Sequence, residues 1–93
     1  MRPGEIRDRL DTKTTHVVVV ISNETFNMMT GRVLVAPFNA TDQVMPGIPA
    51  QEGFVAFQAL HSLPHIALSG PHGMVEQAVL AEAQAILAGA FTQ

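Results

Sequence analysis

The feature that most constrains the fold is an unbroken run of β-branched residues in the first quarter of the chain. Residues 17–21 read Val-Val-Val-Val-Ile, and Thr15 and His16 precede them. Branching at Cβ favours extended backbone, and a short apolar run bounded by polar residues is typical of a strand buried on both faces. The run predicts a central strand over residues 15–21. It is far shorter than the roughly 20 apolar residues that a membrane helix needs, so we expect a soluble cytoplasmic protein without membrane contact.

Shorter elements are expected on both sides of this strand. In chain order they are an edge strand over 4–11, a helical turn over 22–30 that Gly31 closes, a strand over 32–38, a loop or poorly formed strand over 39–52, and short strands over 53–60 and 63–68. Pro37 has no backbone donor, so we expect it at the end of its strand or at an edge.

One amphipathic helix is expected to close the chain. Gly70-Pro71 is typical of a helix start, and apolar residues then recur at helical spacing. They are Val75, Val79, Ala83, Ile86, Leu87 and Ala90. Several strands followed by one helix favour an α+β fold with a small, strongly bent antiparallel sheet or half-open barrel. A chain of 93 residues has room for one domain, so we expect residues 1–93 to form a single unit.

The charge distribution limits what the protein can bind. All five Lys and Arg residues fall within residues 1–32, whereas residues 33–93 carry four acids and no Lys or Arg. Proteins that hold a phosphate backbone by electrostatics alone are usually basic over a whole face, so any contact with nucleic acid must be short and local and use the N-terminal third. Only 14% of the residues are charged, against about 25% usually. So few charges on a small domain favour a surface that a partner covers, and we expect a dimer.

Thiol and metal chemistry are not expected. The chain has no cysteine, which excludes disulfides, thiolate zinc sites and cysteine nucleophiles. His61 and His65 have the i, i+4 spacing of metal ligands on a helix, but Pro64 breaks such a helix and no carboxylate lies near them in the sequence. We interpret both histidines as exposed loop or edge residues, and we expect no metal and no cofactor.

Two blocks of sequence carry a family resemblance. Residues 19–27 read Val-Val-Ile-Ser-Asn-Glu-Thr-Phe-Asn, and residues 31–38 read Gly-Arg-Val-Leu-Val-Ala-Pro-Phe. They resemble the MazF/PemK/Kid toxins of bacterial toxin–antitoxin pairs, where a buried strand ends in Val-Ser-Asn and a later strand in Val-x-Val-Ala-Pro-Ile-Thr. Residues 2–6 resemble the opening strand of that family, Gln58 stands where the family has a Gln, and the closing helix matches in position.

The resemblance implies both a fold and a function. The fold is a small SH3-like (CcdB/PemK-like) antiparallel barrel with a C-terminal helix. The function is that of a toxin, a homodimeric endoribonuclease that cleaves single-stranded RNA without a metal and is neutralised by a cognate antitoxin.

The chain departs from the family pattern at the catalytic positions. In the family an Arg-Pro pair opens the apolar strand and its Arg is catalytic, whereas this chain has His16-Val17 there. Asn39 occupies the position of the second catalytic residue, a Thr, and Leu60 replaces an Arg that commonly follows the Gln. The loop before the apolar strand is also short, at about residues 11–15. These departures affect the expected activity more than the expected fold.

The remaining residues can form a reduced site for RNA cleavage. The reaction needs a base for the ribose 2′-hydroxyl, an acid for the leaving oxygen and donors for the phosphoryl charge. We expect His16, as base or acid, and Asn39, as an amide donor, to be the catalytic residues. The expected substrate-binding residues are Lys13, Thr15, Ser22, Arg32 and Gln58.

Structural roles stay open for three of these residues. His16 also suits a polar position at the mouth of a buried strand, bonded to a neighbouring carbonyl. Asn39 follows a strand that ends in Pro-Phe and suits a turn, and Ser22 suits a helix cap.

Three functions therefore fit the sequence. The first is the toxin endoribonuclease. The alternative is a catalytically degenerate protein of the same fold that binds RNA, an antitoxin or a protein target such as DNA gyrase, as the similarly folded CcdB toxins do. A third is a structural subunit without toxicity. The loss of the family Arg and Thr favours the binding protein, whereas the intact frame and His16 favour the enzyme.

Overall fold

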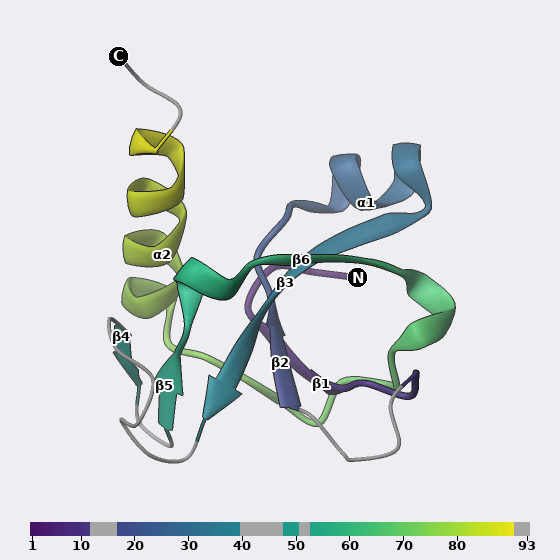
Figure 1. The fold of residues 1–93 in the computed structure, drawn as a ribbon, viewed down its shortest axis with the longest axis horizontal. Helices are drawn as coiled ribbons and strands as arrows, with labels where there is room; N and C mark the ends of the chain where they lie inside the picture. The colour runs from purple at the N-terminus through teal and green to yellow at the C-terminus, as the bar shows by residue number, and fades with distance from the viewer. Residues whose placement is uncertain (12–16, 40–47, 51–52, 91–93) are drawn as a thin grey trace.

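The computed structural model describes residues 1–11, 17–39, 48–50 and 53–90 (Figure 1). These residues form a curved antiparallel sheet of seven strands with one short and one longer helix. The strands are β1 (Glu5–Asp8), β2 (Val17–Val20), β3 (Arg32–Asn39), β4 (Ile48–Ala50), β5 (Gly53–Val55), β6 (His61–Pro64) and β7 (Gly73–Met74). The helices are α1 (Glu24–Thr30) and α2 (Gln77–Gly89), and the 3-10 turns are η1 (Phe57–Ala59) and η2 (His65–Ala67). This is the α+β antiparallel half-barrel with a C-terminal helix that the sequence predicted.

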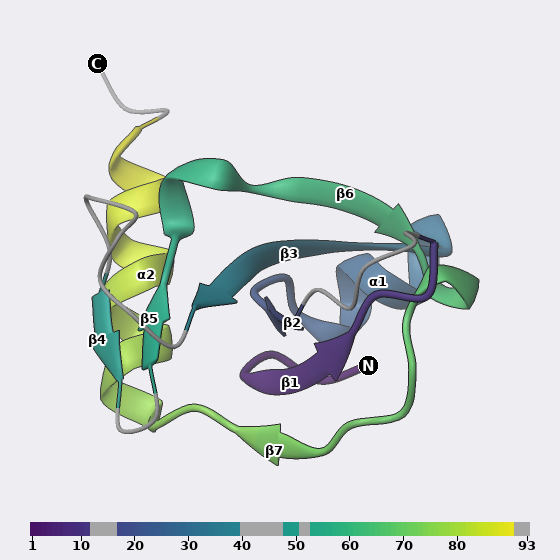
Figure 2. The same cartoon turned by 60° about the horizontal axis from the view of Figure 1, so that its bottom comes forward.

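The sheet is organised around β3, its longest strand. The strand order is β4-β5-β3-β2-β1-β7, and β6 also pairs with β3. One edge of β3 pairs with β2, whereas its other edge pairs first with β6 and then with β5. A bridge between Arg9 and Leu68 joins the end of β1 to the segment after β6. That bridge helps to curl the sheet into a half-closed barrel, and Figure 2 shows β6 and β7 on opposite sides of β1 and β2.

Strand β2 is buried on both of its faces, as the sequence predicted. Val18 and Val20 face the inside of the barrel, and Val19 faces the opposite side, beneath α2. The barrel cluster comprises Val18, Val20, Val33, Val35, Leu63, Ala67 and Leu68. The helix cluster comprises Ile6, Val19, Ile21, Ala36, Ile48, Val55, Val75, Val79, Leu80 and Ala83. The valine run therefore belongs to two cores at once.

Helix α1 has a cap at each end. The Asn23 side chain accepts a hydrogen bond from the Phe26 N–H (2.8 Å). Gly31 ends the helix in the left-handed region, with φ of 67°, and its N–H donates to the Asn27 carbonyl. Gly31 therefore acts as expected, but the cap expected at Ser22 is wrong. The neighbouring Asn23 holds that place because its side-chain oxygen reaches the first turn.

Helix α2 begins later than Gly70-Pro71 predicted. Residues 69–74 instead run beside β1, and the His72 N–H donates to the Ile6 carbonyl (3.0 Å). These bonds hold the chain extended, so the helix starts only at Gln77. The edge strand expected over residues 4–11 is also wrong. β1 is shorter than that, and it pairs with β2 on one side and with β7 on the other, so it is not an edge strand.

Pro37 lies inside β3 and not at an edge or at the strand's end. The Pro37 carbonyl accepts a hydrogen bond from the Ala56 N–H (2.8 Å). The nitrogen and the carbonyl of one strand residue face the same side, so the Pro37 nitrogen, which has no hydrogen to donate, also faces that side. On that side β6 pairs as far as Val35 and β5 begins opposite Phe38. The proline therefore sits where one partner strand gives way to the next, and no strand-to-strand bond is lost.

The middle of the chain forms shorter strands than expected. β4 lies within residues 39–52, which we expected to be a loop or a poor strand, and residues 40–47 lie outside the described residues. β5 and β6 cover only parts of the expected strands over 53–60 and 63–68, because η1 and η2 bend the chain after each of them.

Helix α2 packs on the sheet through a narrow set of residues. Val79, Leu80 and Ala83 are buried. Ile86, which we expected on the buried face, is instead 41% exposed. The Gln84 side chain donates to the Ile21 carbonyl (3.0 Å), which ties the helix to the end of β2. No helix in the described part of the chain is long and apolar enough to cross a membrane.

Candidate functional site

One row of side chains crosses the sheet where β2 begins and β3 ends. Asp8 lies opposite Val17, and extending the β2–β3 register by one residue sets Val17 against Phe38. Phe38 in turn lies opposite Val55. Directly opposed residues of antiparallel strands point to the same face of the sheet, and Val17 and Phe38 pack against the helix cluster. We call Asp8, Val17, Phe38 and Val55 the terminal row.

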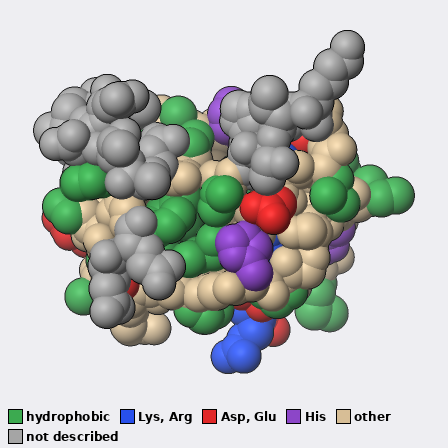
Figure 3. Space-filling view, turned by 90° about the horizontal axis from the view of Figure 1, so that it is seen from below, with side chains coloured by type: hydrophobic (Ala, Val, Ile, Leu, Met, Phe, Trp, Pro, Cys, Tyr) green, Lys and Arg blue, Asp and Glu red, His purple; other side chains and the backbone are tan. Residues whose placement is uncertain are grey.

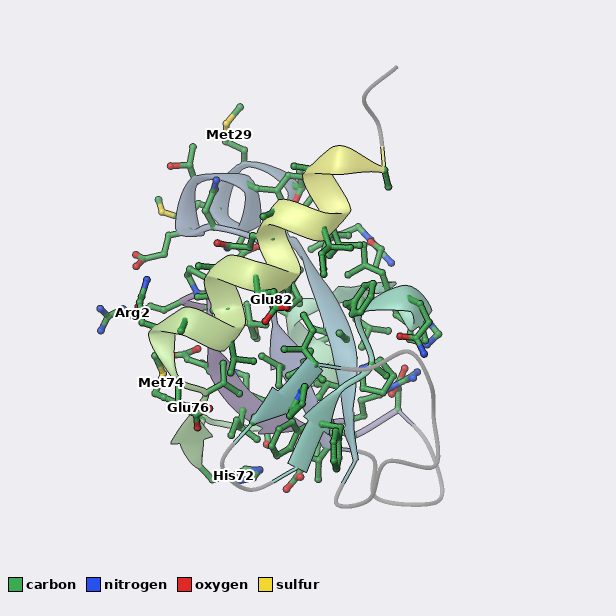
Figure 4. All side chains as sticks on the ribbon, turned by 90° about the vertical axis from the view of Figure 1, so that its left-hand side faces the viewer. Arg2, Met29, His72, Met74, Glu76 and Glu82 are labelled. Atoms are coloured by element: carbon green, nitrogen blue, oxygen red, sulfur yellow. The ribbon has the colours of Figure 1, made fainter. Side chains whose placement is uncertain are left out.

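His72 adds an imidazole to the polar end of the terminal row. Its Nε2 lies 3.3 Å from Oδ1 of Asp8, and 49% of the His72 side chain and 35% of the Asp8 side chain are exposed. His72 lies on the lower side of the molecule (Figure 4). The view from below shows a histidine and an acidic side chain beside a group of exposed hydrophobic side chains (Figure 3). The imidazole–carboxylate pair thus lies at the β1 end of the terminal row, where Asp8 is opposite Val17.

Hydrogen bonds from β1 hold this pair in place. The Asp8 N–H donates to the Ser69 hydroxyl (3.0 Å), and the Ser69 N–H donates to the Asp8 carbonyl (2.9 Å). Three residues later, the His72 N–H donates to the Ile6 carbonyl (3.0 Å). Arg7 adds a bond from Nη1 to the Ser69 carbonyl (2.6 Å). The backbone is therefore anchored to β1 at Ser69 and at His72 itself, and the Val75 N–H donates to the Gly4 carbonyl (2.9 Å) beyond it.

Glu5 and Arg7 form an ion pair that is largely buried. Arg7 donates from Nη2 (2.7 Å) and Nε (3.0 Å) to Oε1 of Glu5, and the Arg2 N–H donates to the same oxygen (3.1 Å). Burial alone raises the pKa of the Glu5 carboxyl, but the hydrogen bonds from Arg2 and Arg7 outweigh it, so the pKa lies below its ordinary value. The ionised Glu5 orients Arg7, which in turn holds Ser69.

Of the two predicted catalytic residues, the structure describes the backbone of Asn39. Asn39 follows Phe38, and its backbone pairs with Phe54. His16, like the predicted binding residues Lys13 and Thr15, lies outside the described residues. The described chain resumes at Val17, the next residue after His16 and a member of the terminal row.

Ser22 and Arg32 lie at the other end of β3. Arg32 donates from Nε to the Ser62 hydroxyl (2.9 Å) and from Nη2 to the Ser62 carbonyl (2.8 Å). The Ser22 hydroxyl donates to the Asn27 side-chain oxygen and accepts from the Leu34 N–H (2.9 Å). β3 has eight residues, so its ends lie up to about 23 Å apart at roughly 3.3 Å per residue. The structure does not bring these two residues to the terminal row.

Gln58 lies closer to the terminal row. It is exposed on η1, three residues after Val55. The bond from the Ala56 N–H to the Pro37 carbonyl places the start of this turn beside the last part of β3. Among the predicted substrate-binding residues that are described, Gln58 is the one whose position suits a contact at this end of the sheet.

The sequence reasoning missed Asp8 and His72. They are 64 residues apart, and neither belongs to a motif or a periodic pattern. They meet because β1 pairs with β2 on one side and β7 on the other. Spacing in the sequence contains no signal for such a pair.

The described residues contain no group of three or more His, Asp or Glu side chains placed to hold a metal ion. His61 lies on β6 and His65 on η2, so their spacing does not fall on an α-helix. His61 is exposed as expected. His65 is half-buried, and its Nε2 is buried without a hydrogen-bond partner.

Comparison with known proteins gives matches in structure alone. No family model matches the sequence, and no curated protein matches it.

Several solved structures share the fold. A MazE–MazF complex from Deinococcus radiodurans is similar with a TM-score of 0.79 and 20% identity, over 100% of this chain and 96% of that one. MazF from the same organism is similar with a TM-score of 0.77 and 18% identity, over 100% of this chain and 97% of that one. An endoribonuclease in complex with its cognate antitoxin, from a mycobacterial species, is similar with a TM-score of 0.76 and 18% identity, over 96% of this chain and 95% of that one. The chain therefore has the fold of the MazF toxins, which confirms the fold that the resemblance implied.

Proposed function

We propose that this chain is the toxin of a toxin–antitoxin pair and a metal-independent endoribonuclease that cleaves single-stranded RNA. The observation that supports this most is the likeness in fold to MazF over nearly the whole length of both chains. One of the similar structures is itself an endoribonuclease bound to its antitoxin. A catalytically active toxin acts in the cytoplasm, where its RNA substrate is found.

In this proposal the RNA lies across the terminal row. Phe38 offers an aromatic contact for a base, and Gln58 contacts the strand nearby. His16 transfers a proton as base or acid, Asn39 donates a hydrogen bond to a phosphoryl oxygen, and Lys13 and Thr15 bind the substrate. The 2′-oxygen bonds to phosphorus and the bond from phosphorus to the 5′-oxygen breaks. The products are a 2′,3′-cyclic phosphate and a 5′-hydroxyl.

The proposal leaves Ser22 and Arg32 outside the cleavage site. Both side chains are bonded to neighbours at the far end of β3. Their contribution is to hold α1 and β6 against β3.

We also propose a homodimer that a cognate antitoxin binds. Several large apolar side chains are exposed, including Met28 at 81% and Met29 at 82% on α1. Exposed apolar groups of this size are typical of protein–protein contacts, and methionine adapts readily to a partner surface.

The first test is RNA cleavage by the purified protein in the presence of a chelator, followed by mapping of new ends on a long single-stranded RNA. We expect cuts at a short recurring sequence, and their loss in His16→Ala and Asn39→Ala. His61→Ala is the matched control, because His61 is exposed on β6 and belongs to no part of the proposed site.

One observation favours a second function. This chain lacks the family Arg and Thr, and has His16 and Asn39 in their places. If folded, dimeric wild-type protein leaves every RNA intact, the protein is a catalytically degenerate toxin that binds RNA, an antitoxin or a protein target such as DNA gyrase. Capture experiments with gyrase, with single-stranded RNA and with candidate antitoxins would then distinguish these targets.

A further inference from the structure

We infer that His72 is a second proton-transfer residue of this site and that Asp8 positions its imidazole. The inference rests on the proposed ribonuclease function. Cleavage of RNA without a metal needs both a base and an acid, and His16 by itself supplies one proton carrier. Within the described residues, His72 is the imidazole that reaches the terminal row.

The register of the strands places the imidazole beside the proposed substrate. Asp8, Val17 and Phe38 lie on three neighbouring strands and point to one face. Neighbouring strands are about 4.8 Å apart, so Asp8 lies about 10 Å from Phe38 along the row. An RNA strand that lies along this row with one base on Phe38 would bring the ribose of a neighbouring nucleotide toward His72.

The contact with Asp8 determines which nitrogen of the imidazole can act. A carboxylate only accepts hydrogen bonds, so the Nε2 that faces Asp8 carries the hydrogen in the neutral ring. Nδ1 then has the free lone pair. A carboxylate that fixes the tautomer and the orientation of an imidazole in this way is the arrangement that makes histidine an effective base in catalytic triads.

The surrounding charges are compatible with this role. Asp8 faces the ring from β1, and Glu76 follows on the same segment, at the start of α2 (Figure 4). Arg7 and Glu5 alternate with Asp8 along β1, so they lie on its other face and neutralise each other there. Asp8 is therefore the carboxylate that contacts the imidazole directly.

The proposed step balances its protons. Nδ1 of His72 takes the proton of the ribose 2′-hydroxyl as the 2′-oxygen bonds to phosphorus. The 5′-oxygen leaves and takes a proton from water or from a protonated imidazole. His72 then returns its proton to solvent. One RNA strand thus becomes two fragments, one ending in a cyclic phosphate and one in a 5′-hydroxyl, with no net uptake or release of protons.

The test compares His72→Asn, Asp8→Asn and the control His61→Asn in single-turnover RNA cleavage between pH 5 and 9, with a chelator present. His72→Asn should slow cleavage by about 10² to 10⁴, the usual contribution of a general base. In the wild type the rate should fall as the pH falls through the range where histidines protonate, about 5 to 8. His72→Asn should lose this acid limb, and His61→Asn should keep it unchanged. Asp8→Asn should lower the single-turnover rate without weakening RNA binding, because the imidazole loses the partner that orients it.

A second variant separates chemistry from folding. In His72→Gly, added imidazole should restore part of the rate, which a merely structural histidine would not allow. Melting temperature and RNA binding of each variant check that the fold and the substrate contact are intact.

The outcomes separate the two proposals. If the wild type cuts RNA and His72→Asn cuts equally fast with the same pH profile as His61→Asn, His72 has no proton-transfer role, although the ribonuclease proposal stands. If the folded wild type cuts no RNA at any pH, the ribonuclease proposal fails and the role of His72 fails with it. A wild type that cuts, a slow His72→Asn and rescue of His72→Gly by imidazole would establish the inference.

Discussion

At the scale of single residues, the buried Glu5–Arg7 pair supports the segment that includes His72. Removing one partner of a buried ion pair leaves an uncompensated charge and typically costs about 3–5 kcal/mol. Arg7 also donates to the Ser69 carbonyl, so the effect reaches beyond β1. The pair therefore contributes to stability and to the shape of the site.

The pair makes stability depend on pH. The folded-state pKa of Glu5 lies below its unfolded value, which is about 4.3 for a free Glu. Its contribution is therefore fully present above the unfolded pKa and is lost as the pH falls through the folded pKa. We expect the free energy of unfolding to decline below about pH 4.5, and to decline less steeply in Glu5→Gln.

Urea unfolding between pH 3 and 7 measures this dependence. The control is Glu82→Gln, because Glu82 is exposed on α2. If the free energy of unfolding declined with pH equally steeply in Glu5→Gln and in the wild type, the pH dependence would not come from Glu5.

At the scale of secondary-structure elements, the ends of the helices are determined by different causes. α1 ends at Gly31, where only a left-handed residue lets the chain turn into β3. α2 starts where the bonds between β1 and residues 69–74 stop, so its beginning depends on a partner strand. A local signal marks the first boundary, and a long-range one marks the second.

Two glycine substitutions distinguish these boundaries. Gly31→Ala should lower the free energy of unfolding by about 1 kcal/mol, because a Cβ is unfavourable at positive φ. A Cβ at Gly31 would meet no atom within 4 Å, so the cost comes from the backbone alone. Gly89→Ala, also in open space but at the end of α2, should be neutral or stabilising by up to about 1 kcal/mol.

Chemical denaturation of both variants gives the comparison. Equal effects of the two substitutions would mean that Gly31 is not held in the left-handed region.

At the scale of the whole molecule, the sheet carries two cores that share β2 and β3. The barrel cluster lies inside the curled sheet, and the helix cluster lies between the sheet and α2. The terminal row is the edge of the helix cluster. The position of α2 therefore influences the surface on which we place the RNA.

Packing of α2 is testable with two alanines of the same helix. Ala83 is fully buried and Ala85 is exposed. Ala83→Leu should destabilise the protein by about 1–3 kcal/mol, because extra methyl groups cannot be accommodated in a packed core. Ala85→Leu should change stability by less than about 0.5 kcal/mol.

Thermal unfolding suits this comparison, since 1 kcal/mol corresponds to a shift of about 4–8 °C in Tm for a domain of 60–100 residues. A small shift for Ala83→Leu would show that α2 does not pack on the sheet as described.

Much of the fold was predictable from local patterns. The β-branched run predicted a strand buried on both faces, Gly31 predicted the end of α1, and the spacing of apolar residues predicted the C-terminal helix. Errors occurred where a partner strand overrides the local pattern, as at Gly70-Pro71 and Pro37. The candidate site was less predictable, since Ser22 and Arg32 lie at the end of β3 opposite to Asn39.

The sequence by itself determined the elements whose cause lies within a few residues: the central strand, the capped helix α1, and the existence of α2. Only the tertiary structure decided the terminal row and the pair of Asp8 with His72. Backbone propensity and periodicity act over one or two turns, whereas neighbours across a sheet depend on which strands pair and in which register. A contact between residues 64 positions apart has no local cause, so it exists only in the folded chain.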